Sequence, residues 1–308
     1  MLPAREETMK KKIVIAYDGS PNSRDALQLG ARLAVALGAT PVITYCVSFP
    51  RYLMDPLEVG LVIDEVARPV LNDAEFSLNM ADVETRALLD QSPSRSLNLL
   101  AEEISPVAIV IGSAHSGTFG RVHLGSVGKQ LTTSAPCAIV VAPRGFADGS
   151  DHDMQSVCVG IDQSSESDNA LREAAALAAS LEATLRVVTV REPIGYKSIP
   201  LEALHDLGIA QSRYTAEMLE TAAKRVTEDI RVEIDRLEGD PGPVLADYSG
   251  RFDLLVVGSR GYGPLRRVLL GSVSSYLMDH ARCPVVVVPR GTHVAADTSA
   301  DATAPLAS

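Results

Sequence analysis

The chain alternates between short, almost wholly apolar runs and longer segments in which apolar residues recur at every third or fourth position. Residues 12–17 form an apolar run rich in β-branched side chains, and a stripe at helical spacing follows it. The stripe consists of Ala26, Gly30, Leu33 and Leu37. A continuous apolar run predicts a strand buried on both faces, whereas the stripe predicts a helix packed on a sheet.

The same alternation continues along the chain. Further strands are predicted at 41–47, 82–88, 107–111 and 138–142, and later at 185–190, 231–237, 253–257 and 284–288. Helical segments are predicted at 57–80, 94–104, 201–228 and 242–250, with short helices that begin at Gly125 and Gly271. Alternating strands and helices are typical of an α/β fold with a parallel sheet and helices on both faces.

The chain is an internal duplication. The sequence IVIAYDGS at 13–20 recurs as VCVGIDQS at 157–164, which places Asp18 and Asp162 at equivalent positions. IVIGS at 109–113 recurs as LVVGS at 255–259, and LGSV at 124–127 recurs unchanged at 270–273. Both copies also close on a cysteine, an apolar run and Pro-Arg, which end at Arg144 and Arg290. Four blocks in a constant order and spacing indicate two copies of one α/β domain.

The duplication divides the chain into five segments. We expect a flexible N-terminus at 1–10, a first domain at 11–144 (unit 1), a polar linker at 145–153 and a second domain at 154–290 (unit 2). Residues 291–308 are mostly Ala, Thr, Ser and Asp without an apolar period, so a disordered tail is predicted there.

The net charge and the absence of an apolar segment limit the partners and the location that we expect for the protein. The chain has 308 residues and a formal net charge of −11. A field of that sign repels nucleic acid and anionic membranes, so neither is expected as a partner. The start of the chain has no apolar signal segment, and no run of about 18 apolar residues occurs. A cytoplasmic location without a membrane span is therefore expected.

Cysteines and histidines give no sign of a metal site. The four cysteines lie far apart in or beside predicted strands, so buried structural thiols are expected. They are Cys46, Cys137, Cys158 and Cys283. The six histidines lack metal-ligand spacing, and no Ser-His-Asp or Cys-His arrangement is suggested.

Candidate binding chemistry gathers where the predicted strands end. Ligands of an open α/β sheet bind beyond the carboxyl ends of its strands. In each unit an aspartate ends the first strand, and a Gly-rich loop leads from the fourth strand into a helix. Glycine lets the backbone approach a phosphate closely, and the free N–H groups of a helix N-terminus favour an anion. Cationic side chains follow Gly258 in the sequence: Arg260, Arg266 and Arg267.

Each of these residues also has a purely structural interpretation. A single glycine fits a turn or a helix cap, Asp18 and Asp162 fit caps for the helices that follow them, and Ser272 fits an N-cap. The arginines fit a solvated surface. The combination of spacing, strand context and duplication favours the binding interpretation.

At these residues the chain resembles the universal stress protein family. Nucleotide-binding members of that family carry a glycine, two residues, a second glycine, nine residues, and then glycine followed by serine or threonine. Gly258, Gly261, Gly271 and Ser272 match this pattern. The resemblance extends over roughly residues 10–144 and 154–290, and it implies two tandem Rossmann-like domains, each with a five-stranded parallel sheet. It also implies ATP, with or without Mg²⁺, in each competent unit.

The resemblance assigns roles to individual positions. Asp18 and Asp162 would lie against the ribose and adenine, Val47 and Val190 would contact the base, and the glycines would hold the phosphates. The implied nucleotide-binding residues are Asp18, Val47, Gly112, His115, Gly125, Ser126 and Val127 in unit 1, and Gly160, Asp162, Val190, Gly258, Arg260, Gly261, Gly263, Gly271, Ser272 and Val273 in unit 2. The family also pairs domains through their fifth strands, which here implies pairing within one chain and is compatible with a homodimer.

Unit 1 departs from the pattern at one position. His115 stands where the second glycine belongs. If the backbone there needs the left-handed region, a non-glycine residue costs about 1–2 kcal/mol. Alternatively, Gly117 and Gly120 reshape the loop and His115 donates to a phosphate.

The expected function is an ATP-binding regulatory protein of the stress response. The alternative is an enzyme on the same scaffold that hydrolyses ATP or transfers an adenylyl group, but no SGGxDS, HIGH or Walker signature is present. Gly112 to Gly117 has the Walker glycine spacing, yet Thr118 replaces the required lysine. No dedicated catalytic constellation is predicted, although slow hydrolysis is compatible with the scaffold. A structural dimer without nucleotide would require both loops to be degenerate, and the loop of unit 2 is not.

Overall fold

The computed structural model describes residues 10–48, 55–149, 153–162, 164–192, 201–226, 229–259 and 270–289. Unit 1 contains β1 (Lys12–Ala16), α1 (Pro21–Leu37), β2 (Thr40–Ser48), α2 (Pro56–Val62), α3 (Arg68–Leu78), β3 (Glu84–Asp90), α4 (Pro93–Ile104), β4 (Ala108–Gly112), α5 (Ser126–Ser134) and β5 (Ala138–Ala142). Unit 2 contains β6 (Ser156–Gly160), α6 (Ser165–Ser180), β7 (Thr184–Arg191), α7 (Leu201–Lys224), β8 (Val232–Glu238), α8 (Pro241–Tyr248), β9 (Leu254–Gly258), α9 (Ser272–His280) and β10 (Val285–Val288). The predicted alternation of strands and helices is confirmed.

The two units share one sheet. Among the described residues its strand order is β3-β2-β1-β4-β5-β10-β9-β6-β7-β8. The strands within each unit are parallel, and β5 and β10 pair antiparallel, with Val140 opposite Val286. The expected pairing of the fifth strands is therefore present within a single chain. Because that junction is antiparallel, the carboxyl ends of the strands point in opposite directions in the two units.

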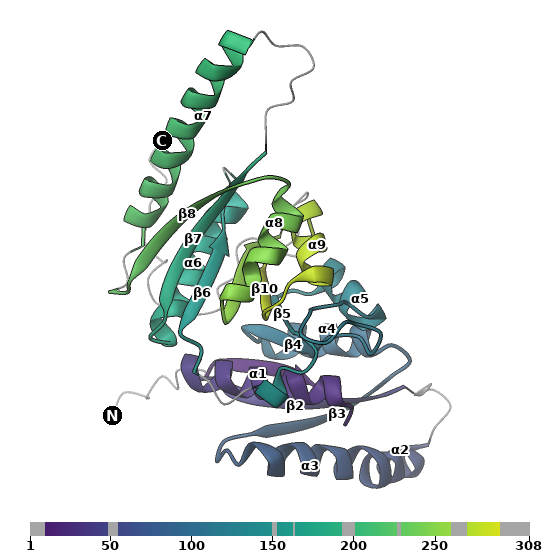
Figure 1. The fold of residues 1–308 in the computed structure, drawn as a ribbon. Helices are drawn as coiled ribbons and strands as arrows, with labels where there is room; N and C mark the ends of the chain where they lie inside the picture. The colour runs from purple at the N-terminus through teal and green to yellow at the C-terminus, as the bar shows by residue number, and fades with distance from the viewer. Residues whose placement is uncertain are drawn as a thin grey trace, which may run out of the picture.

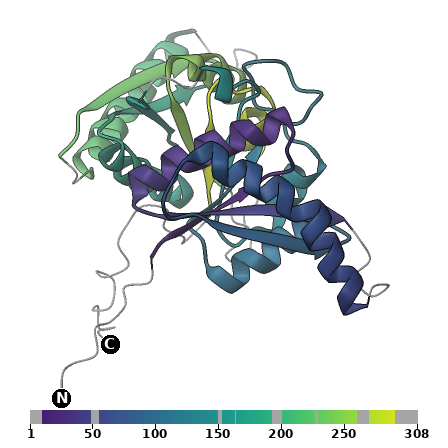
Figure 2. The same ribbon diagram turned by 90° about the horizontal axis from the view of Figure 1, so that it is seen from below.

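Helices cover both faces of the sheet. One face packs against α1, α3, α6 and α7, and the other packs against α4, α5, α8 and α9 (Figures 1 and 2). Each apolar cluster contains residues of both units, so the packing is continuous across the junction. Val140 and Val286 belong to one cluster, and Ile139 and Val287 belong to the other, as the alternation of side chains along a strand requires.

The helical segment predicted at 57–80 is interrupted. A π-helical turn, Ile63–Ala67, separates α2 from α3. Pro69 stands at the start of α3. Proline has no N–H to donate and its ring crowds the preceding turn, so the wider turn allows the helix axis to continue past it.

The segment that connects unit 1 to unit 2 begins in contact with α1. The carboxylate of Asp25 is 3% exposed and accepts hydrogen bonds from the backbone N–H groups of Gly145 and Ala147, both at 2.8 Å. Ala147–Gly149 then form a short 3₁₀ turn. Asp25 therefore fixes the direction in which the chain leaves unit 1.

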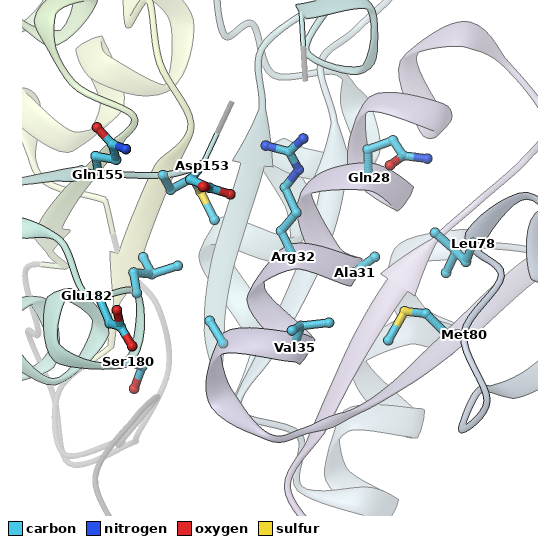
Figure 3. A pocket seen from close by; sticks show the side chains of 13 residues that line it. Gln28, Ala31, Arg32, Val35, Leu78, Met80, Asp153, Gln155, Ser180 and Glu182 are labelled. Carbon is cyan, nitrogen blue, oxygen red and sulfur yellow. The ribbon is translucent and has the colours of Figure 1, made fainter. Parts of the chain in front are cut away.

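A cleft of about 640 Å³ lies between the units, away from the carboxyl ends of their strands. One wall is the face of α1 that carries Gln28, Arg32 and Val35, and the other wall includes Asp153 and Glu182 (Figure 3). Arg32 also lies over the ring of Phe146, 5.6 Å from its centroid. The lining of this cleft combines side chains of both charges with apolar side chains.

In the described part of the chain, none of the helices combines the length and the apolar content needed to cross a membrane.

Candidate functional site

Unit 1 has a cleft of about 540 Å³ at the carboxyl ends of its strands. That volume lies within the range of about 300–1,000 Å³ that is usual for small-molecule sites. The cleft brings together most of the predicted residues of unit 1. They are Asp18, Gly112, His115, Gly125, Ser126 and Val127.

Asp18 follows β1 and does not cap the next helix itself. Ser20 is the N-cap of α1, and its side chain accepts from Ser23 N–H at 3.2 Å. The carboxylate of Asp18 accepts from Ser20 N–H at 3.0 Å, which forms a tight turn. Burial alone would raise the pKa of Asp18, but hydrogen bonds from Ser20 and Ser23 and the nearby His115 outweigh it and lower the pKa. The cleft therefore contains a carboxylate that stays ionised at neutral pH.

The N-terminus of α5 opens into this cleft. Gly125 is its N-cap, and no side chain accepts a hydrogen bond from its first turn. The first N–H groups of a helix have no partner within the helix, so this end favours an anion. Ser126 occupies the first helical position, which leaves its hydroxyl as a further donor beside those N–H groups.

Gly112 is required by packing. A Cβ at this position would lie 2.0 Å from the backbone oxygen of Asn22, so any side chain would collide with the first turn of α1. The Asn22 side-chain amide donates to the carbonyl of Ser113 at 2.6 Å across the same contact. Gly112 therefore lets α1 start close to the end of β4.

His115 causes no backbone strain. Its φ is not positive, and within the loop 113–125 the positive φ falls on Gly120, at 73°. The penalty considered for His115 does not arise, and the structure matches the alternative in which other glycines reshape the loop. Arg144 stabilises that shape, because its guanidinium donates to the carbonyls of His115 at 3.3 Å and Gly117 at 2.8 Å.

Unit 2 has an equivalent cleft of about 300 Å³, as lined by the described residues. The predicted residues in its lining are Gly160, Asp162, Val190, Gly258, Gly271, Ser272 and Val273. Gly271 is the N-cap of α9, again without a side-chain cap, so Ser272 is not the N-cap that one interpretation gave it. Arg260, Gly261 and Gly263 lie outside the described residues.

The local geometry of unit 1 is repeated at Asp162. Its carboxylate accepts from Ser164 N–H at 2.8 Å, and Ser164 caps α6. A Cβ on Gly258 would lie 2.6 Å from the backbone oxygen of Glu166, which matches the contact of Gly112 with Asn22. The two clefts are therefore built by the same local contacts.

The prediction that Val47 lines the cleft is wrong by one residue. The residues of β2 that line the cleft are Thr44, Cys46 and Ser48, and Val47 is not among them. Successive side chains of a strand point to opposite faces, so Val47 lies on the other face of the sheet. Val188 and Val190 of β7 line the cleft of unit 2, as does Glu192 directly after the strand, so the equivalent of Val190 is Cys46.

Several lining residues have no counterpart in the sequence prediction. The first turns of α4 and α8 contribute Pro93 and Leu97 in unit 1 and Pro241 and Leu245 in unit 2. Proline at the start of both helices is a sequence signal that would have pointed to them. Together with Cys46 or Val190, these residues give each cleft an apolar part of its lining.

The two clefts differ in charge. The cleft of unit 2 contains four carboxylates, those of Asp162, Glu166, Glu192 and Asp240. Asn22 and Ser48 of unit 1 occupy the places of Glu166 and Glu192. Across the described residues, no group of three or more His, Cys, Asp or Glu side chains is arranged to hold a metal ion.

Comparison with known proteins identifies both units. The model of the universal stress protein family matches residues 9–143 and again residues 154–289. Universal stress protein Rv2319c of Mycobacterium tuberculosis is 26% identical over 292 residues, which cover 90% of this chain and 99% of that protein. Universal stress protein Rv2005c of the same organism is 32% identical over 185 residues, 58% of this chain and 60% of that protein.

The fold has a counterpart among solved structures. A universal stress protein from Archaeoglobus fulgidus superposes with a TM-score of 0.62 and 20% sequence identity, over 91% of this chain and 98% of that one. At this identity the similarity concerns the fold, including the tandem arrangement of the two units.

Proposed function

The chain belongs to the universal stress protein family, and we propose that it is an ATP-binding regulatory protein of the stress response with one nucleotide site in each unit. One observation carries the proposal: in both units an uncapped helix N-terminus and the aspartate after the first strand line the same cleft. An anion donor site and a carboxylate within one small cleft suit a phosphorylated sugar.

Each part of the nucleotide has a matching part of the cleft. The N–H groups of α5 and α9, with Ser126 and Ser272, would bind phosphate. Asp18 and Asp162 would accept hydrogen bonds from ribose hydroxyls. The apolar side chains that α4 and α8 contribute to the clefts would contact the adenine. A Mg²⁺ ion that accompanied ATP would be held mainly by the phosphates, since Mg²⁺ commonly uses one or two carboxylates plus phosphate oxygens and water.

Calorimetric titration of the full chain with ATP tests the proposal, with the small molecules released from freshly purified protein identified in parallel. Gly125→Asp and Gly271→Asp each place a carboxylate at one helix N-terminus, and each should abolish one of two binding events. Gly149→Asp adds the same charge at an exposed position where a Cβ would meet nothing within 4 Å, so it is the matched control. Protein that is purified empty and binds no added ATP would refute the proposal.

The same samples separate a regulatory role from the enzymatic alternative. A regulatory site should release ATP mostly unchanged. Conversion to ADP or AMP that is faster than nucleotide release would favour an ATP-hydrolysing or adenylyl-transferring enzyme.

A further inference from the structure

The loop that leads to α5 in unit 1 is held by unit 2 as well as by its own unit. Within unit 1, Ala114 N–H donates to the carbonyl of His123 at 2.8 Å. At the far side of the loop, Val122 N–H donates to the carbonyl of Ala281, also at 2.8 Å. Ala281 directly follows α9 of unit 2, which lies beside the start of α5 (Figure 1).

One carboxylate of unit 2 makes the decisive contacts. Oδ1 of Asp279 accepts from Leu124 N–H at 3.1 Å and lies 3.1 Å from Nδ1 of His123. Leu124 immediately precedes Gly125, the N-cap of α5. The side chains of His123 and Asp279 are about one-third exposed, and Leu124 is 4% exposed. Asp279 therefore fixes the backbone one residue before the N–H groups that would meet a phosphate.

The sequence does not repeat this charged pair in the opposite direction. The two units are offset by 146 residues in this region, so Thr133 is the counterpart of Asp279 and Leu269 is the counterpart of His123. Leucine has no ring nitrogen and threonine carries no charge, so unit 1 cannot offer unit 2 the same pair. The Thr133 hydroxyl instead donates to the carbonyl of Gln130 within its own helix.

The support on the side of unit 2 is rigid. Leu277, Met278 and Ala281 are fully buried in the apolar cluster that also contains Val122 and Leu124. The ring of Tyr276 stacks on that of His280 at 4.0 Å between centroids. The packing therefore fixes the end of α9, from which Asp279 reaches the loop of unit 1.

We propose that Asp279 of unit 2 is a positioning residue for the nucleotide site of unit 1, so that this site is complete only when the two units are docked. The inference rests on the proposed function, since it concerns the same site. Gly120 and Arg144 shape the loop from within unit 1, and Asp279 adds a contact from unit 2 at the residue before the N-cap of α5. The site of unit 2 cannot receive the same contact, because Thr133 stands in the place of Asp279.

Site-resolved ATP titration of the full chain tests this. In a Gly271→Asp background, which leaves only the site of unit 1, Asp279→Ala should weaken binding about tenfold, the loss expected for one hydrogen bond to a charged group. Asp279→Asn keeps an oxygen that can accept from Leu124 N–H and should recover most of the affinity. In a Gly125→Asp background, Asp279→Ala should leave the site of unit 2 within about twofold of its starting affinity, because the effects of independent sites add to within about that factor.

One control and one further variant show whether the effect is specific to the contact of Asp279 with the loop. Thr133→Ala, the equivalent substitution on α5, should change neither site. His123→Leu copies the residue of unit 2 and should weaken only the site of unit 1, which provides a second test should Asp279→Ala not fold.

Each result decides the question. Unchanged binding at unit 1 in both Asp279→Ala and His123→Leu, or an equal loss at both sites, would overturn this inference and leave the proposed function intact. Failure of the unsubstituted chain to bind ATP at either site would overturn the proposed function and this inference together.

Discussion

A methyl group added at Gly112 is expected to destabilise the start of α1. In Gly112→Ala the new Cβ would lie 2.0 Å from the oxygen of Asn22, 2.6 Å from its carbonyl carbon and 3.3 Å from Ser23 N. These are backbone atoms, so a change of rotamer cannot relieve the contact. A normal van der Waals distance is about 3.5 Å, so the first turn of α1 must move away from β4 by more than an ångström.

The magnitude follows from what that movement breaks. Overpacking in a tight interior costs about 1–3 kcal/mol. The movement also separates the amide of Asn22 from the carbonyl of Ser113, and both residues are about 5% exposed or less. A buried polar group left without its partner costs a further 1–3 kcal/mol or so. The free energy of unfolding should therefore fall by about 2–6 kcal/mol.

Urea denaturation followed by circular dichroism measures this change, with Gly60→Ala as the control. Gly60 lies in α2, where an added Cβ would meet nothing within 4 Å, so alanine there should leave stability unchanged or raise it by up to about 1 kcal/mol. If Gly112→Ala unfolded at the same urea concentration as Gly60→Ala, the contact with Asn22 would not be the reason for glycine at this position.

Three further predictions concern single side chains. Asp25→Ala removes the acceptor of two partly buried N–H groups and should lower the free energy of unfolding by about 1–3 kcal/mol in urea titrations; no change would contradict the role of Asp25 in the linker. Burial raises the pKa of the Cys46 thiol, so a thiol reagent should label it slowly at neutral pH and faster as the pH rises. ATP should slow that labelling because Cys46 lines the cleft, and equal rates with and without ATP would place the nucleotide elsewhere. The lowered pKa of Asp18 adds stability above its ordinary value of 3.8 that is lost as the pH falls through the folded-state value. The melting temperatures of the unsubstituted chain and Asp18→Asn should therefore converge as the pH falls through the folded-state pKa of Asp18, and a difference that stayed constant through the whole acid range would refute the assignment.

Much of the site was predictable because it depends on local sequence. Asp18 and Asp162 end apolar runs, and Gly125 and Gly271 open short helices, so their place at the carboxyl ends of strands follows from the alternation of strands and helices. The register of β2 was not predictable to one residue. The end of an apolar run does not say which face each side chain takes, and Val47 was expected where Cys46 lies.

The roles of the glycines were also only partly predictable. Spacing predicts that Gly112 and Gly258 belong to a phosphate loop, whereas the structure shows that a Cβ at either position would collide with the backbone of the first helix turn of the same unit, at Asn22 and Glu166 respectively. His115 was suspected of strain, yet the positive φ of the loop falls five residues later, at Gly120. A motif fixes which residues are present and leaves open which of them carries the unusual conformation.

The sequence by itself determined the duplication, the α/β class and the two groups of residues that line the clefts, because each depends on periodicity or on motifs within one unit. Only the tertiary structure decided which atoms Gly112 must avoid and that Asp279 reaches the loop of unit 1. Leu124 and Asp279 are 155 residues apart, and no local pattern relates them. Their contact exists because the antiparallel pairing of β5 and β10 brings α9 to the start of α5.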